Sequence, residues 1–252
     1  MSVLAFVNDA LMALFFLLVG MEIKQEILIG ELSSIRKAIF PIVAAFGGMI
    51  IPVMVFLAFC YSSPDSRGAA IPMATDIAFA LSVLALLGNR VPLSLKIFLT
   101  ALAVTDDIGG IIIIALFYSG HVAITPLLLS GLLLLGLYLG NRMRINSNTF
   151  YYLGGFFVWF FFLESGIHPT IAGVLVAFTI PAKSSMQLEG FVDRISSSIK
   201  SLPLNEGERS AKATVLSDTQ IHMLHKMEDA SSKVISPLQN MSHRLHPYVN
   251  YL

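Results

Sequence analysis

Long apolar stretches are the feature of this sequence that most constrains its fold. Several of them approach the length of about 20 residues that a helix needs to cross a bilayer. The chain of 252 residues is 56% hydrophobic and only 13% charged, whereas a soluble domain has about a quarter of its residues charged. We therefore predict an all-α, polytopic membrane protein with about seven transmembrane helices, at residues 3–21, 38–60, 68–87, 92–118, 121–140, 150–164 and 167–182.

Basic residues alternate along the chain between the predicted loops. From the first loop to the long segment after residue 182, the loops carry 3, 1, 2, 0, 2, 0 and 8 lysine and arginine residues. Cytoplasmic loops are enriched in these residues, so we predict that the N-terminus of this chain is periplasmic. The formal net charge of zero gives no indication of a nucleic-acid partner. The single cysteine, Cys60, excludes an internal disulfide framework.

The sequence divides into three predicted regions. Residues 1–182 form the transmembrane domain. Residues 183–245 are polar and rich in serine, and we predict that they form a cytoplasmic loop with a short amphipathic helix. That helix is indicated by apolar residues at helical spacing within 217–236. Residues 246–252 become apolar again, which predicts the start of a further membrane helix, truncated here.

Acidic side chains inside the predicted spans indicate the chemistry. Asp106 and Asp107 are neighbours in the fourth span, and Asp76 lies in the third. Past Lys96, the predicted spans contain no lysine or arginine to pair with them. A charged side chain at the bilayer centre costs about 2.5–3.5 kcal/mol even on a lenient scale, so such acids usually mark an ion path. We predict that the partner of these acids is a proton or a metal cation.

The adjacent carboxylates predict an exchange of cations for protons. Two like charges in a low-dielectric medium cannot both stay ionised, so Asp106 and Asp107 should titrate as one coupled unit. Sodium, a hard cation, prefers oxygen ligands such as carboxylates. Bound sodium and bound protons would then compete for the same charge. Gly109 and Gly110 follow after Ile108 and permit close approach of another backbone.

The third predicted span reads as a broken helix. Pro72 removes a backbone donor and disfavours helix at the preceding residue. Thr75 and Asp76 follow within a turn, where Asp76 can offset the positive end of a helix dipole. The alternative is that Asp76 only hydrogen-bonds neighbouring backbone. For Asp9, near a predicted helix start, a structural role as a cap is the favoured interpretation.

Several long motifs resemble the NhaA family of sodium/proton antiporters. They are NDALMALFFLLVGMEIKQE, AIPMATDIAFALSVLALLGNRVPLSLKIFL, DDIGGIIIIALFY, SGIHPTIAGVLVAF and HRLHPYVNYL. The resemblance covers residues 3–182 and 237–252. It implies a twelve-helix, inverted-repeat transporter of the bacterial inner membrane, and this family is itself a known example of transport through broken helices. It also implies export of sodium or lithium against more than one proton by alternating access, without a cofactor and without enzymatic activity.

The resemblance assigns roles to individual residues. Asp106 and Asp107 match the paired aspartates that bind sodium and carry protons, and Thr75 and Asp76 match the Thr-Asp of the unwound helix. The cytoplasmic pH-sensing cluster of the family matches five residues here: Glu22, Lys24, Glu26, His243 and His246. Histidine suits such a role because its charge changes near neutral pH. The alternative for this cluster is a solvated rim of charge.

The sequence also departs from the family pattern. The first family helix, the hairpin through which members dimerise, the second broken helix and the membrane lysine beside the aspartates are all missing. Gln25 and Ser242 stand where members often carry arginine and glutamate. We expect from these differences that the chain is a fragment, inactive alone, whose partners are membrane lipid, sodium and protons.

Two other functions are compatible with acids on membrane helices. An intramembrane aspartyl protease could use Asp76 and Asp106 as general acid and base, but the Gly-x-Gly-Asp signature of that class is absent from the sequence. A non-transporting membrane scaffold would use its acids only to join helices. In the scaffold, neutralising Asp106 and Asp107 would leave cation binding and pH response unchanged, because neither would exist.

Overall fold

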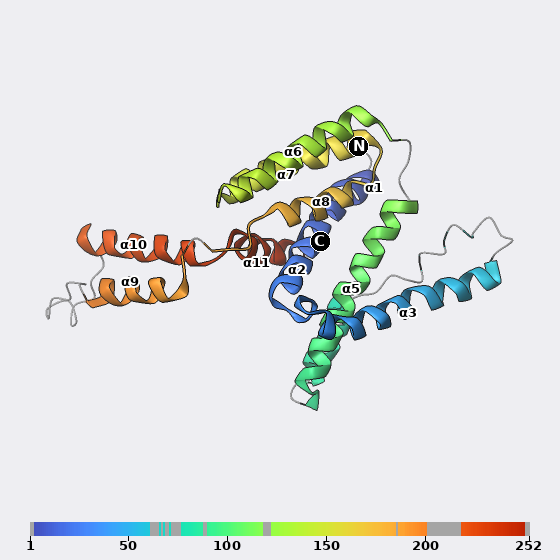
Figure 1. Ribbon diagram of the computed structural model, residues 1–252, viewed down its shortest axis with the longest axis horizontal. Helices are drawn as coiled ribbons and strands as arrows, with labels where there is room; N and C mark the ends of the chain where they lie inside the picture. Colours follow the sequence, from blue (N-terminus) through green and yellow to red (C-terminus); the bar gives the residue numbers. More distant parts are fainter. Residues whose placement is uncertain are drawn as a thin grey trace.

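A computed structural model describes residues 3–60, 66, 68, 71, 77–87, 90–117, 122–184, 186–200 and 218–249. Within these residues the chain is all-α, without strands (Figure 1). The elements are α1 (Val3–Phe6), the π-helical turn η1 (Val7–Leu11), α2 (Met12–Ile29), the 3-10 turn η2 (Glu31–Ser33), α3 (Ile35–Cys60), α4 (Ile77–Leu87), α5 (Leu93–Phe117), α6 (Ile124–Arg142), α7 (Asn148–Ser165), α8 (Pro169–Thr179), α9 (Leu188–Lys200), α10 (Asp218–Val234) and α11 (Pro237–Val249).

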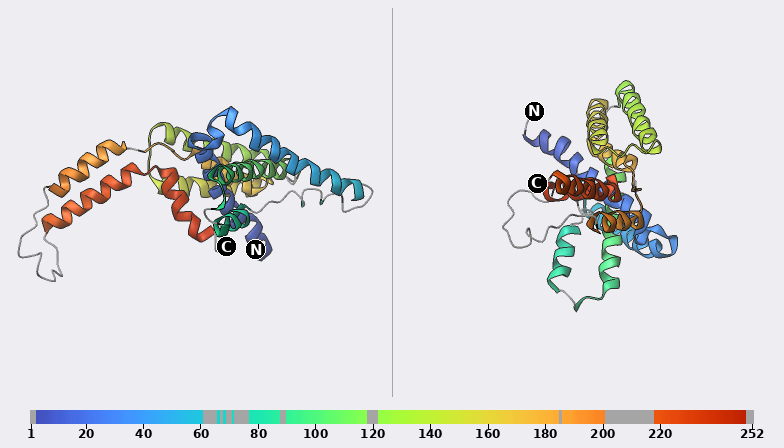
Figure 2. Two further views of the ribbon diagram at one scale, coloured as in Figure 1. Left: turned by 90° about the horizontal axis from the view of Figure 1, so that it is seen from below. Right: turned by 90° about the vertical axis from the view of Figure 1, so that its left-hand side faces the viewer.

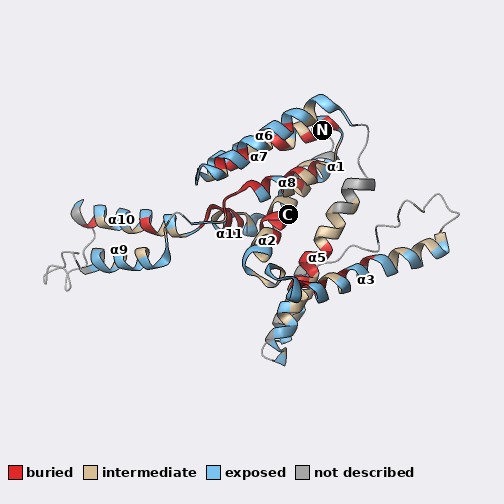
Figure 3. Cartoon of the chain, viewed as in Figure 1, coloured by how far each residue is buried: buried red, intermediate tan, exposed pale blue. Residues whose placement is uncertain are grey.

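Helices α2, α8, α7 and α6 form the larger packed group. Helix α2 lies along α8, α8 lies along α7, and α7 pairs with α6 (Figure 1). Their shared core includes Met21 of α2, Tyr151 and Val158 of α7, and Val176 of α8, and α11 adds Met241 to it. Figure 3 shows the buried residues concentrated on these facing sides. The large side chains therefore interlock at the centre of the group.

Glycine permits the close contact between α2 and α8. A Cβ atom at Gly173 of α8 would lie 2.4 Å from the carbonyl oxygen of Ala13, which is backbone and cannot rotate away. A Cβ atom at Gly20 of α2 would lie 2.8 Å from the Cβ atom of Ala177. Helices in a bilayer associate through such small residues, because lipid provides no hydrophobic drive for their association.

Helices α3 and α5 form a second group that joins the first through α2. Phe40 of α3 and Phe98 of α5 stack with ring centroids 5.0 Å apart. Val19 and Ile23 of α2 pack with Val104 of α5 in a separate small core. Much of the remaining surface of α3 is exposed apolar side chain (Figure 3). That exposure suits a helix in lipid, and by length and composition α3 and α6 can each cross a membrane.

Each predicted span contains a helix within the part of the chain that the structure describes. The prediction at 92–118 corresponds to α5, and those at 150–164 and 167–182 correspond to α7 and α8. The prediction at 3–21 covers α1, η1 and the first part of α2, and the helix itself continues to Ile29. The count of seven spans stays a prediction, because most of the region between α3 and α4, with the predicted break at Thr75 and Asp76, lies outside the described residues.

Beyond α8 the chain forms a helical hairpin and then returns to the first group. Helices α9 and α10 lie side by side and project away from the other helices (Figures 1 and 2). Helix α10 lies where the sequence predicts an amphipathic helix, whereas α9 lies in the part of the 183–245 segment predicted to be loop. Helix α11 begins at Pro237, earlier than the helix expected near residue 246, and packs on α2.

Candidate functional site

The paired acids lie in the middle of α5. Asp106 is buried, and Asp107 is half-buried beside it. Thr105 directly precedes the pair, and its buried hydroxyl donates a hydrogen bond to the carbonyl oxygen of Ala101, one turn earlier, at 2.8 Å, so it is satisfied within the helix. Because adjacent residues of a helix point about 100° apart, the two carboxylates face different neighbours.

Helices α2 and α3 supply the surroundings of this pair. Val104, two residues before Asp106, packs on Val19 and Ile23 of α2. On the other side, a Cβ atom at Gly109 would lie 2.2 Å from the sulfur of Met49 on α3. The Met49 side chain therefore occupies the space that a side chain at position 109 would fill. Helix α3 thus packs against α5 just beyond the acids. The pair thus lies where three helices meet.

A line of charged groups connects this meeting point with α11. Glu22 of α2 is close enough to Asp107 for their charges to interact. On its other side, the Oε1 atom of Glu22 lies 3.5 Å from the Nε2 atom of His246 on α11. The structure thus brings together three of the predicted functional residues, from three helices. Within the described residues no three histidine, cysteine or acidic side chains converge as a metal cage.

Comparison with known proteins decides the family. The sequence pattern of the family described as Na+/H+ antiporter 1 matches residues 1–252. The chain is 60% identical over 252 residues to the Na(+)/H(+) antiporter NhaA of Parabacteroides distasonis. It is 53% identical over 251 residues to the protein of the same name from Porphyromonas gingivalis and 51% identical over 252 residues to that of Phocaeicola vulgatus.

This chain belongs to the Na+/H+ antiporter 1 family. The three matches cover all of the chain but 56% of each relative, so the chain spans little more than half the length of the antiporters it resembles. The family resemblance expected from the motifs is confirmed, as is the all-α fold of a polytopic membrane protein.

The other residues that the family pattern assigns lie in different surroundings. The ammonium group of Lys24 hydrogen-bonds the carbonyl oxygens of Phe178 and Ile180 at the end of α8. Glu26 lies two residues after Lys24 on α2, half-buried, with its carboxylate beside Gly30. His243 lies on the exposed side of α11, about one turn before His246. Thr75 and Asp76 lie outside the described residues. The assigned roles of all these residues stay predictions.

Burial changes the proton affinity of two groups beyond the predicted first span. Burial raises the pKa of Glu22 above its ordinary value, and the nearby charge of His246 partly offsets that increase. Burial also lowers the pKa of Lys24 from 10.5 to about 8. Both shifts favour the neutral form of the group, as expected where water is partly excluded.

Sequence reasoning missed two polar contacts in this chain. The side chain of Asn141, at the end of α6, donates a hydrogen bond to the carbonyl oxygen of Thr179 at 2.7 Å. The indole of Trp159 on α7 donates one at 2.6 Å to the carbonyl oxygen of Asp9. Asp9 itself lies inside the π-helical turn η1, not at a helix cap. The only sequence signal for the Asn141 contact is a side-chain amide near the end of a predicted helix. The sequence pattern gives no signal for the contact between Trp159 and Asp9.

Proposed function

We propose that this chain carries the cation- and proton-binding part of a sodium/proton antiporter of the bacterial inner membrane. The observation that carries the proposal is the placement of Asp106 and Asp107 side by side where α5 meets α2 and α3. Family membership favours transport over the protease and scaffold alternatives. Sodium or lithium and protons are the proposed transported ions.

The coupling follows from the charge of the carboxylate pair. Ionised, both acids in a partly desolvated place repel each other and attract a cation, and oxygen is the ligand that sodium prefers. Protonated, they have little affinity for it. A site that alternates between these two states, and is exposed to one side of the membrane at a time, exchanges sodium for protons. No cofactor is required for this cycle.

Glu22 and His246 extend the pair toward the predicted cytoplasmic side. Glu22 adds a third carboxylate near Asp107, and the His246 imidazole lies next to Glu22. We propose that this line is the path by which cytoplasmic ions reach the pair. The family's pH-sensing role, for Glu22, Lys24, Glu26, His243 and His246, and the supporting role of Thr75 and Asp76 at a broken helix remain part of this proposal. So does the orientation, with the 183–245 segment in the cytoplasm.

The chain spans only 56% of the length of the Parabacteroides distasonis antiporter, so transport is tested in a chimera that supplies the rest of that protein. In a chimera, residues 1–252 replace the matching segment of the Parabacteroides distasonis antiporter. Sodium-dependent pH change in everted vesicles is then compared for residues 1–252 alone, the chimera, and the chimera with Asp106→Asn or Asp107→Asn. Each substitution should lower exchange by about 100-fold, because losing one partner of a buried ionic contact costs about 3 kcal/mol or more and 1.4 kcal/mol is tenfold.

Asp193→Asn is the matched control. This aspartate is exposed on α9, away from the three helices that meet at the pair, so its amide should leave exchange at the level of the unsubstituted chimera. If Asp106→Asn or Asp107→Asn exchanged sodium like that control, the proposed site would be wrong. If the unsubstituted chimera showed no sodium-dependent pH change, the chain would be better described as the scaffold.

A further inference from the structure

The carbonyl end of α8 is held by three other parts of the chain. A helix leaves its last carbonyl oxygens without partners in its own backbone. Here four consecutive carbonyl oxygens, at Phe178, Thr179, Ile180 and Pro181, each accept a hydrogen bond from a residue distant in sequence. This end of α8 is therefore a junction and not a free terminus.

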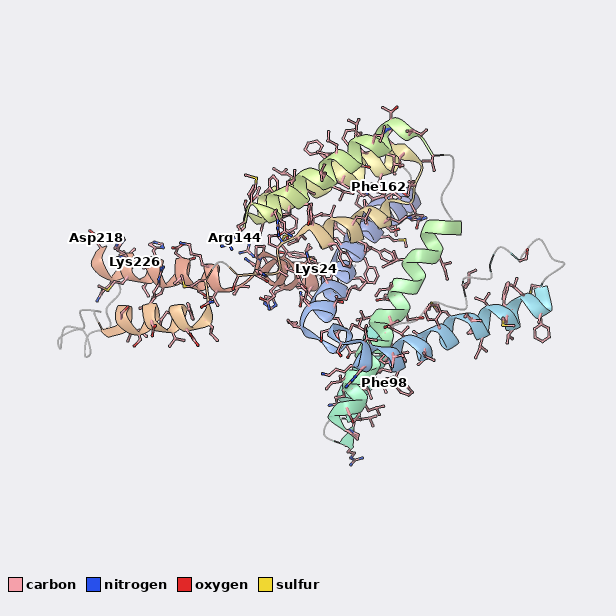
Figure 4. The ribbon with its side chains drawn as sticks, in the orientation of Figure 1. Lys24, Phe98, Arg144, Phe162, Asp218 and Lys226 are labelled. Atoms are coloured by element: carbon pink, nitrogen blue, oxygen red, sulfur yellow. The ribbon has the colours of Figure 1, made fainter. Side chains whose placement is uncertain are left out.

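The donors come from α2, α6 and the start of α11. The Lys24 ammonium donates to Phe178, at 2.7 Å, and to Ile180. The carbonyl oxygen of Thr179 accepts a hydrogen bond from the Asn141 side chain at 2.7 Å. That of Pro181 accepts one from the backbone N–H of Leu238 at 3.1 Å. Figure 4 shows Lys24 where α2, α8 and α11 come together. Lys24 alone among these donors is charged, and a cation also interacts favourably with the negative end of a helix.

Lys24 and Glu22 point to different sides of α2. Side chains two residues apart on a helix are separated by about 200° around its axis. The contacts agree with this separation, since Lys24 binds α8 while Glu22 faces Asp107 and His246. The Lys24 contact with α8 thus fixes the rotation of this part of α2. If that contact were lost, α2 could turn and carry the Glu22 carboxylate away from α5.

We propose that Lys24 is a positioning residue, which holds the end of α2 against the carbonyl end of α8 and so directs Glu22 toward the Asp106–Asp107 pair. This inference rests on the proposed function for its consequence, although the contact itself does not. This positioning role is compatible with the pH-sensing role proposed for Lys24, and it differs from that of a charge on a solvated rim. The role also predicts that arginine, which can donate to two carbonyls at once, replaces lysine better than an apolar residue does.

Two measurements on the chain in detergent test the proposal. Hydrogen–deuterium exchange, read on peptides within residues 20–30 and 176–184, reports on the contact. Binding of sodium-22 reports on its consequence. The variants are Lys24→Met, Lys24→Arg and, as the control, Lys226→Met on exposed α10. Loss of the charged donor in Lys24→Met should speed exchange in both segments by about tenfold and weaken sodium binding by about fivefold. Lys24→Arg and Lys226→Met should resemble the unsubstituted chain.

Each outcome bears on the proposal. Unchanged exchange in Lys24→Met would overturn it, and so would faster exchange with unchanged sodium affinity, because the contact would then be structural only. Failure of Lys24→Arg to restore both readouts would also overturn it. If the unsubstituted chain bound no sodium, the proposed function would fail, whereas the exchange data would still decide whether the contact exists. If Lys24→Met did not fold, as judged by the fluorescence of the single tryptophan, Lys24→Gln would take its place.

Discussion

At the residue scale, Gln25 is the clearest uncompensated polar group. Its Nε2 atom is buried and has no hydrogen-bond partner among the described residues. A buried donor without a partner costs about 1–3 kcal/mol, whereas methionine has a similar shape and a similar helix propensity. We therefore predict that Gln25→Met leaves the midpoint of thermal unfolding in detergent unchanged or raises it. The matched control is Gln239→Met, which removes a side chain bonded to Ser236 and should lower the midpoint. A lower midpoint for Gln25→Met would contradict this reading of Gln25.

Lys24 should give the stability of the chain a recognisable pH dependence. Burial lowers its pKa to about 8 from the ordinary 10.5. Between these values the unfolded chain binds a proton that the folded chain does not, so the free energy of unfolding rises with pH. Arginine stays charged throughout this window. We predict that the unfolding midpoint of the unsubstituted chain, relative to that of Lys24→Arg, increases from about pH 8 to pH 10.5. A constant difference across this window would show that Lys24 does not titrate there.

At the scale of elements, the sequence predicted helices better than it predicted their contacts. The span predicted at 92–118 nearly matches α5, because long apolar runs in a bilayer can satisfy their backbone only as helices. Helix α9 was missed, since its short sequence mixes serine with charged residues and has no apolar run. For the site, adjacent acids in an apolar span predict Asp106 and Asp107, and their role stays a prediction. The contact of Lys24 with Phe178 depends on how α2 packs on α8, and the spacing of residues within one helix carries no such information.

The α2–α8 contact gives a sharp test of helix packing. Gly173→Ala places a methyl group within 2.8 Å of two backbone atoms, Ala13 O and Leu17 N. Overpacking of this kind costs about 1–3 kcal/mol, because neither helix can move without losing its other contacts. Gly136→Ala on α6 is the control, since a Cβ atom there meets nothing within 4 Å and alanine is the better helix former. We expect the unfolding midpoint to fall for Gly173→Ala and to hold or rise for Gly136→Ala. Equal midpoints would mean that α2 and α8 lie further apart than described.

At the scale of the whole molecule, the α9–α10 hairpin is a separable part. Its two helices pack chiefly against each other and project away from the membrane helices (Figure 2). The backbone N–H of Met186 donates a hydrogen bond to the carbonyl oxygen of Lys233 at 3.1 Å, so the two ends of the hairpin lie next to each other. The Glu22–His246 contact and the carbonyl end of α8 both lie on the other side of this base, on α2, α8 and α11.

We predict that the hairpin can be removed without loss of the proposed cation site. Residues 187–232 are replaced by a short glycine-serine link, which needs to span only the distance that the hydrogen bond between Met186 and Lys233 already closes. The core of α2, α7, α8 and α11 is untouched, so the unfolding midpoint and the sodium-22 affinity should stay close to those of the full chain. As a matched control, replacing α11 from Pro237 onward removes Met241 from the core and His246 from Glu22, and should lower both. If the hairpin deletion lowered sodium affinity as much as the loss of α11 did, the 183–236 segment would belong to the ion path and not stand apart from it.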